Sequence, residues 1–172
     1  MDIKNFYLVK EIYDLEALKR EPEEYIGGFN NNFLVEFIEK NRNKYVENGI
    51  LLLEGSVIFS SNNKEIGQIP LFDDLPTIYS YYLNAIEEYM EHGVANFYYP
   101  SQPIEVRIEK QNARKAKINI DEDSLVVNEQ IFLESFINNS QNFFGILANQ
   151  LKLKNYQHEL AQIENIKKRL VK

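Results

Sequence analysis

The stretch IEVRIEKQNARKAKINI, from Ile104 to Ile120, has the most regular alternation of apolar and polar residues in the chain. In its first half isoleucine and valine alternate with charged residues, and in its second half alanine and isoleucine alternate with lysine and asparagine. A period of two places the apolar side chains on one face of a strand and the polar ones on the other. The pattern breaks at 111–114. We therefore predict two antiparallel strands with one buried and one charged face.

A helix is predicted over 74–92, and a strand at NFYYP separates it from this hairpin. Asp73 or Asp74 can cap its start, Pro76 is tolerated in the first turn, and Gly93 suits its end. Apolar residues recur between these ends at helical spacing, so the segment reads as an amphipathic helix with one face in the core.

The flanking segments complete the expected organisation, which is a single domain over 1–172. Segment 1–48 is predicted to be helical, with Asp14 capping a short helix. The middle, 49–121, is strand-rich apart from helix 74–92. Two amphipathic helices are predicted over 128–171. This order predicts an α+β fold, an antiparallel β-meander of four to six strands with helices packed on one face.

Composition excludes several classes of protein. Hydrophobic residues make up 44% and aromatic residues 13% of the 172 residues, as in a folded globular protein. No apolar run approaches the roughly 18 residues of a membrane helix, so we expect a cytoplasmic protein without membrane contact. Cysteine is absent, which excludes disulfides, thiolate metal sites and cysteine nucleophiles.

Motifs for catalysis are also missing. The two histidines, His92 and His158, form no HExxH or H-x-H pair, and the seven glycines form no phosphate-binding loop. No GxSxG sequence marks a serine nucleophile. We therefore predict no enzyme activity, no catalytic residues, no metal and no cofactor.

The net charge of −7 is unevenly distributed. Segment 61–105 has seven acidic residues and one basic residue, whereas 106–172 has eight acidic and eleven basic residues. An acidic middle disfavours nucleic acid, because phosphate binding needs a basic track. It favours a basic protein as the partner.

Tyrosines accompany these acids, and tyrosine is common at protein interfaces because it offers a large contact area with few rotatable bonds. The plainer interpretation is a core helix with a solvated back, followed by a strand in which one of Tyr98 and Tyr99 is buried. The predicted partner-binding residues are Asp73, Asp74, Tyr81, Glu87, Glu88, Glu91, Tyr98 and Tyr99.

A resemblance to a known class covers about residues 49–150. The segments GILLLEGSVIFS and EIGQI, then Leu75-Pro76, then NFYYPSQPIEVRIE with its Pro100 to Pro103 corner, resemble the small acidic immunity proteins of bacterial toxin systems. The resemblance implies that the chain binds one cognate toxin and blocks its active site. The chain departs from the pattern in having no tryptophan, its first 45 residues have no counterpart, and no binding residue carries over.

Three alternatives stay open, as does the oligomeric state. One is a structural or assembly protein of a phage or secretion system, acting by homo- or hetero-oligomeric contact. Another is a hydrolase whose carboxylates would have to meet in a concave pocket. The third is nucleic-acid binding through Arg107, Arg114, Lys115 and Lys117, which interleaved acids disfavour.

Overall fold

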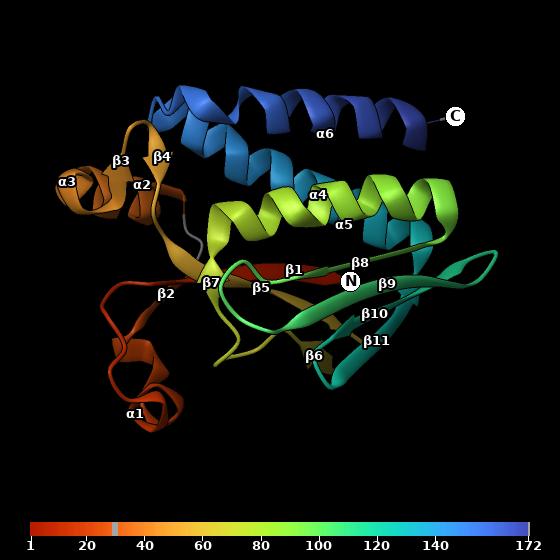
Figure 1. Cartoon of the computed structure of the whole chain (residues 1–172), viewed down its shortest axis with the longest axis horizontal. Helices are drawn as coiled ribbons and strands as arrows, with labels where there is room; N and C mark the ends of the chain where they lie inside the picture. Colours follow the sequence, from red (N-terminus) through yellow and green to blue (C-terminus); the bar gives the residue numbers. More distant parts are fainter. Residues whose placement is uncertain (29–30, 172) are drawn as a thin grey trace.

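The hairpin predicted at Ile104–Ile120 is present, and it is formed by β9 (Glu105–Asn112) and β10 (Lys115–Ile120) (Figure 1). The structure is a computed structural model that describes residues 1–28 and 31–171. Ile108 pairs with Ile118, and both side chains are fully buried. Arg107 pairs with Asn119 on the opposite, solvated face. The alternation in the sequence thus corresponds to the two faces of the sheet.

The strands and helices follow one another along the chain, most of them with short connections. The strands are β1 (Asp2–Leu8), β2 (Ile26–Gly28), β3 (Val46–Glu47), β4 (Ile50–Leu51), β5 (Glu54–Ser61), β6 (Lys64–Ile66), β7 (Asp73–Asp74), β8 (Val94–Tyr98), β9, β10 and β11 (Asp123–Asn128). The α-helices are α1 (Leu15–Arg20), α2 (Asn31–Lys40), α3 (Arg42–Tyr45), α4 (Leu75–His92), α5 (Glu129–Gly145) and α6 (Gln157–Leu170). A π-helical segment, Ile146–Gln150, continues α5.

Two antiparallel sheets make up most of the strand layer. The meander has the order β11-β10-β9-β8, so strands consecutive in sequence are neighbours in space. The second sheet has the order β2-β1-β5-β6, with β7 also paired to β5. The sheets adjoin where β11 contacts β5 and β6. A small hairpin, β3–β4, lies apart from both.

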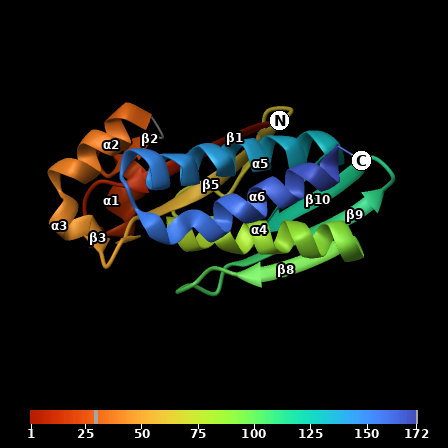
Figure 2. The ribbon, with the colours of Figure 1, turned by 90° about the horizontal axis from the view of Figure 1, so that it is seen from above.

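The three long helices cover the same face of the strands (Figure 1). Seen from above, α6 lies over α4 and α5, and it contacts both (Figure 2). The predicted α+β class, with antiparallel strands in a meander and helices on one face, is confirmed. The described helices are all too short or too polar to cross a lipid bilayer.

Helix α4 occupies the range predicted to be helical and begins and ends as its sequence requires. The Asp74 side chain accepts a hydrogen bond from the Thr77 backbone N–H, 2.9 Å away. Gly93 ends the helix with φ 74°, a left-handed conformation that glycine adopts without the steric penalty of a side chain. Helix α4 is therefore both a core element and a fixed support for the surface residues on its outer side.

An aromatic core joins α4, α5 and β5. The ring centroid of Phe136 lies 5.2 Å from that of Tyr82, 5.8 Å from that of Tyr79 and 6.1 Å from that of Phe59. All four residues are fully buried. Burial of the apolar surface of these rings is a major part of the stability of the fold.

The N-terminal segment agrees with its prediction in part. Asp14 caps α1, its side chain accepting the Glu16 N–H at 2.9 Å, and α2 and α3 are helical, whereas the first strand was not predicted. Residues 1–48 were predicted to be helical, but β1 lies between β2 and β5 in the middle of a sheet, with Asn5 paired to Val57. The sequence DIKNFYL hides this strand because the polar residue Asn5 is itself buried, where it accepts a hydrogen bond from the Tyr79 hydroxyl. The apolar residues that follow are buried on both faces, so the period of two is lost.

Candidate functional site

The eight predicted partner-binding residues do not form one surface. Tyr81, Glu88, Glu91 and Tyr98 are exposed. The other four, Asp73, Asp74, Glu87 and Tyr99, are buried or half-buried and are bonded within the chain. Four of the predicted residues are therefore accessible to a partner, and the other four take part in contacts within the chain.

Asp73 is the clearest correction, because only 4% of it is exposed. One carboxylate oxygen accepts the Asp74 N–H at 2.8 Å and the other accepts the Ser101 N–H at 2.6 Å. Buried carboxylates need such donors, since an unpaired buried charge is very costly. Asp73 thus ties the Pro100–Pro103 corner to the start of α4.

Tyr99 is a second correction. It is 3% exposed, and its hydroxyl shares a 3.3 Å hydrogen bond with the Ser56 hydroxyl. Burial raises the pKa of the Tyr99 phenol above its usual value of 10.0. Tyr98, in contrast, is 54% exposed, so the strand alternates as the plainer interpretation of the two tyrosines stated.

The three glutamates on α4 meet different partners. The Glu87 carboxylate accepts a hydrogen bond from the Gln162 side chain at 2.6 Å, and Glu91 lies 3.5 Å from the Arg169 guanidinium of α6. Within residues 1–28 and 31–171, the Glu88 side chain has neither a hydrogen bond nor an ion pair. Two of the three glutamates that were predicted to bind a partner therefore contact α6 instead, Glu87 through a hydrogen bond and Glu91 through an ion pair.

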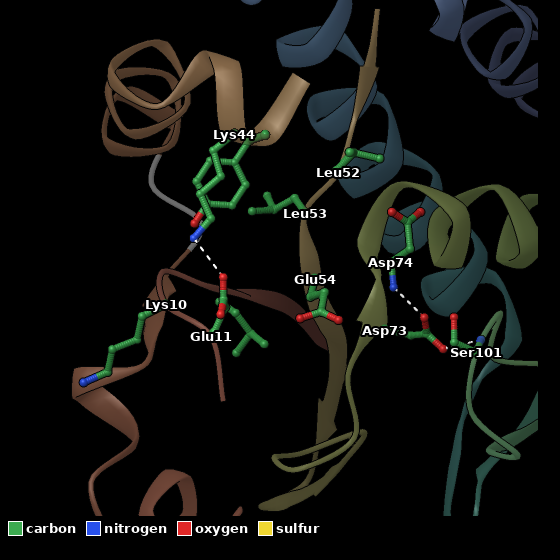
Figure 3. A pocket seen from close by; sticks show the side chains of 11 residues that line it. Lys10, Glu11, Lys44, Leu52, Leu53, Glu54, Asp73, Asp74 and Ser101 are labelled. Atoms are coloured by element: carbon green, nitrogen blue, oxygen red, sulfur yellow. Dashed lines mark hydrogen bonds and ion pairs between the residues drawn. The ribbon is translucent and has the colours of Figure 1, made fainter. Parts of the chain in front are cut away.

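A cavity of about 310 Å³ lies where the N-terminal segment meets the start of α4 (Figure 3). It gathers side chains from five separate parts of the chain. The lining residues are Leu8, Lys10, Glu11, Lys44, Tyr45, Leu52, Leu53, Glu54, Asp73, Asp74 and Ser101.

A second hollow, of about 450 Å³, adjoins this cavity and shares Lys10, Glu11 and Lys44 with it. Its further lining residues are Val9, Tyr13, Asp14 and Tyr25. We call the two hollows together the acidic groove, because they are lined by five acidic residues and two lysines.

Both lysines of the acidic groove are already paired. The Lys10 ammonium lies 3.1 Å from the Glu24 carboxylate and 4.0 Å from the centre of the Tyr25 ring. The Lys44 ammonium lies 3.6 Å from the Glu11 carboxylate, which also accepts a hydrogen bond from Tyr13. Among the described residues, no basic side chain pairs with Glu54.

The charged groups nearest to Glu54 along the cavity wall are other carboxylates. Glu54 stands directly opposite Asp74 in the β5–β7 pair, and Figure 3 shows it between Glu11 and the Asp73–Asp74 pair. Burial, followed by the charges of Asp73, Asp74 and Glu11, raises the pKa of Glu54 above its usual 4.5. Like charges directly opposite one another destabilise a sheet. Within the described residues, Glu54 is therefore repelled by its acidic neighbours and has no basic side chain to offset that repulsion.

We expect the Glu54→Gln variant to be more stable than the wild type at neutral pH. A raised pKa means that the folded protein ionises Glu54 less readily than the unfolded chain does, so stability falls as pH rises above about 4.5 and stays lower above the raised value. Glutamine keeps the shape and removes that loss. Thermal unfolding should show a higher midpoint for the variant near neutral pH and no difference near pH 4.

The control for this prediction is Glu122→Gln, in the exposed turn between β10 and β11, which should leave the midpoint unchanged at both pH values. A Glu54→Gln midpoint below that of the wild type at neutral pH would show that Glu54 makes a stabilising interaction.

The acidic groove offers little for metal-assisted or paired-carboxylate chemistry. In the described part of the chain, no three histidine, aspartate or glutamate side chains are placed to hold a metal ion. Asp73 is fully hydrogen-bonded and Asp74 caps α4, which leaves Glu54 as the one carboxylate of the 310 Å³ cavity without a bonded partner among described residues. A hydrolase would need a second such group.

Local sequence patterns did not indicate this groove. Glu54 follows a leucine run at the first position of β5, and Glu11, Tyr13 and Tyr25 belong to a segment without a clear pattern. Its tyrosines are also not those predicted. Comparison with known proteins adds nothing here, since no family model, curated protein or solved structure matches the chain.

Proposed function

We propose that the protein binds and neutralises a basic protein, as bacterial immunity proteins do with toxins, and that the acidic groove receives a basic side chain of that partner. The observation that carries this proposal is Glu54, an exposed carboxylate on the wall of the groove that is surrounded by the charges of three other acids and has no basic partner within the described residues. A residue that lowers stability without bonding in its own chain is typical of a functional site.

The groove suits a lysine or arginine side chain. A cation beside Glu54 would relieve the repulsion among the carboxylates, while the exposed side chain of Leu52 would cover the apolar stem of the incoming residue. Leu52 is 45% exposed and Tyr13 is 89% exposed, so a partner would also bury apolar surface that is now in water.

Overall charge supports the same partner class. Nuclease toxins are basic because they bind phosphates, and the net charge of this chain is −7. Opposite net charges accelerate association, and the desolvated contacts in the groove would then slow dissociation.

The test compares Glu54→Lys with Glu122→Lys, which makes the same change of charge in an exposed turn. Each variant would be co-expressed with the product of the adjacent gene, and growth and the dissociation constant would be measured. Reversing the charge in the groove should weaken binding about tenfold or more and abolish growth rescue, whereas Glu122→Lys should retain both.

Two results would contradict the proposal. One is an equal loss of affinity in both variants at low salt, which would show that binding depends only on the net charge of the protein. The other is full rescue by Glu54→Lys, which would place the contact elsewhere on the protein.

A further inference from the structure

Strand β8 is an open edge of the meander. It pairs with β9 on one side, no described strand pairs with its other side, and Figure 2 shows it along the outer margin beyond α4. The Lys110 N–H donates to the Gly93 carbonyl at 2.8 Å and the Tyr99 N–H donates to the Ile104 carbonyl at 3.0 Å. Because alternate residues of an antiparallel strand face the same neighbour, the backbone groups of Val94, Asn96 and Tyr98 point away from β9.

This edge lacks the usual protection against pairing with another chain. Charged residues, proline or very short length normally protect an edge strand. The edge strands of the other sheet fit that rule, since β2 has three residues and β6 has three residues that include Lys64 and Glu65. Strand β8 has five residues, VANFY, with no charge and no proline.

The sequence of β8 is complementary to itself. We propose that β8 pairs antiparallel with β8 of a second copy of this chain, on a two-fold axis at Asn96. In this register Val94 of one copy lies opposite Tyr98 of the other, and both side chains are exposed in the single chain, at 36% and 54%. A cross-strand pair of an aromatic and a β-branched residue is favourable. The outward backbone groups would form about six hydrogen bonds.

Charges beside the edge do not oppose this pairing. On β9, Glu109, Arg107 and Glu105 lie beside Val94, Asn96 and Tyr98. The two-fold axis separates Arg107 from its equivalent by three strand spacings, about 14 Å. That distance exceeds the Debye length at physiological salt, so the repulsion is largely screened.

Helix α4 adds a second contact around the same axis. Tyr81 is 38% exposed, and its ring packs against Phe97 with centroids 5.9 Å apart. Glu88 lies two helical turns further along the same side of α4, toward the other end of β8. The two-fold axis therefore brings Tyr81 of one copy near Glu88 of the other, where the phenol can donate to the carboxylate.

A second copy fits this edge better than a basic peptide does. A basic segment would place charges beside the apolar side chains of Val94 and Tyr98, whereas β8 itself supplies matching apolar ones. The edge shares no lining residue with the acidic groove, so the inference holds whether or not the proposed function is correct.

The test is analytical ultracentrifugation of the whole chain over about 5–500 µM, a range that covers micromolar affinities. We expect the wild type to dimerise. Val94→Lys should raise the dissociation constant of the dimer about tenfold or more, because the β-branched partner of Tyr98 is lost at two places in each dimer and a charged edge residue disfavours pairing. Val126→Lys is the matched control, since Val126 is 46% exposed on β11, and this variant should dimerise like the wild type.

Hydrogen exchange tests the register directly. At high concentration the amides of Asn96 and Tyr98 should exchange more slowly in the wild type than in Val94→Lys, while circular dichroism shows that both are folded. Asn96→Pro removes an outward N–H without removing a hydrogen bond to β9, and it should also give a monomer. A wild type that stays monomeric over the whole range, or equal weakening by Val94→Lys and Val126→Lys, would overturn the inference.

Discussion

Replacing Phe136 by alanine is expected to lower the free energy of unfolding by about 3–5 kcal/mol, the largest effect of any substitution considered for this protein. Phe136 is fully buried and packs against rings from β5 and α4 as well as its own helix. Alanine would leave a cavity at the point where the helices meet the strands. Typical domains are stable by only about 5–15 kcal/mol, so the variant would be close to unfolding.

Urea denaturation followed by circular dichroism would measure this loss. Ile131→Ala provides the comparison, because Ile131 is on the same helix but 48% exposed and should change stability by no more than about 0.5 kcal/mol. A Phe136→Ala loss as small as that of Ile131→Ala would mean that the aromatic core is not packed as described.

Replacing Asp73 by alanine is expected to lower the free energy of unfolding by about 2–4 kcal/mol, since two backbone donors lose their acceptors. The donors belong to Asp74, at the start of α4, and to Ser101, in the corner before β9. Removing the carboxylate would therefore release a contact between segments 28 residues apart. The loss would appear in urea denaturation at neutral pH.

Two further variants separate this hydrogen-bonding role from simple loss of charge. Asp73→Asn keeps one acceptor and should lose less stability than Asp73→Ala. Asp123→Ala removes an exposed aspartate and should have almost no effect. If Asp73→Asn and Asp73→Ala were both as stable as the wild type, the buried carboxylate would have no structural role.

Local patterns in the sequence predicted the elements that depend on local interactions. The β9–β10 hairpin follows from alternation alone, and α4 follows from its capping aspartate, its apolar stripe and Gly93. Asp73 shows where local reasoning ends. Two adjacent aspartates are typical of an exposed surface, so the sequence predicted that Asp73 is exposed. Its burial depends on a hydrogen bond from the Ser101 N–H, 28 residues away in the sequence.

The acidic groove could not be predicted for a similar reason. Its lining comes from the end of β1, the segment around Tyr13, α3, β5 and β7, and only the fold brings these together. The unpredicted strand β1 forms part of that arrangement. Exposure of Tyr81 and Glu88, and of one of Tyr98 and Tyr99, was expected from the sequence. Their position around an unpaired edge depends on the order of the strands in the sheet.

The position of β1 between β2 and β5 also affects how the chain folds while it is being made. Its second partner, β5, lies about fifty residues later, so at typical rates of translation β1 would wait about 3–10 s for the strand that covers its other edge. During that interval its apolar side chains are available to chaperones. The meander β8–β11 has no such delay, because each of its strands pairs with the one just synthesised.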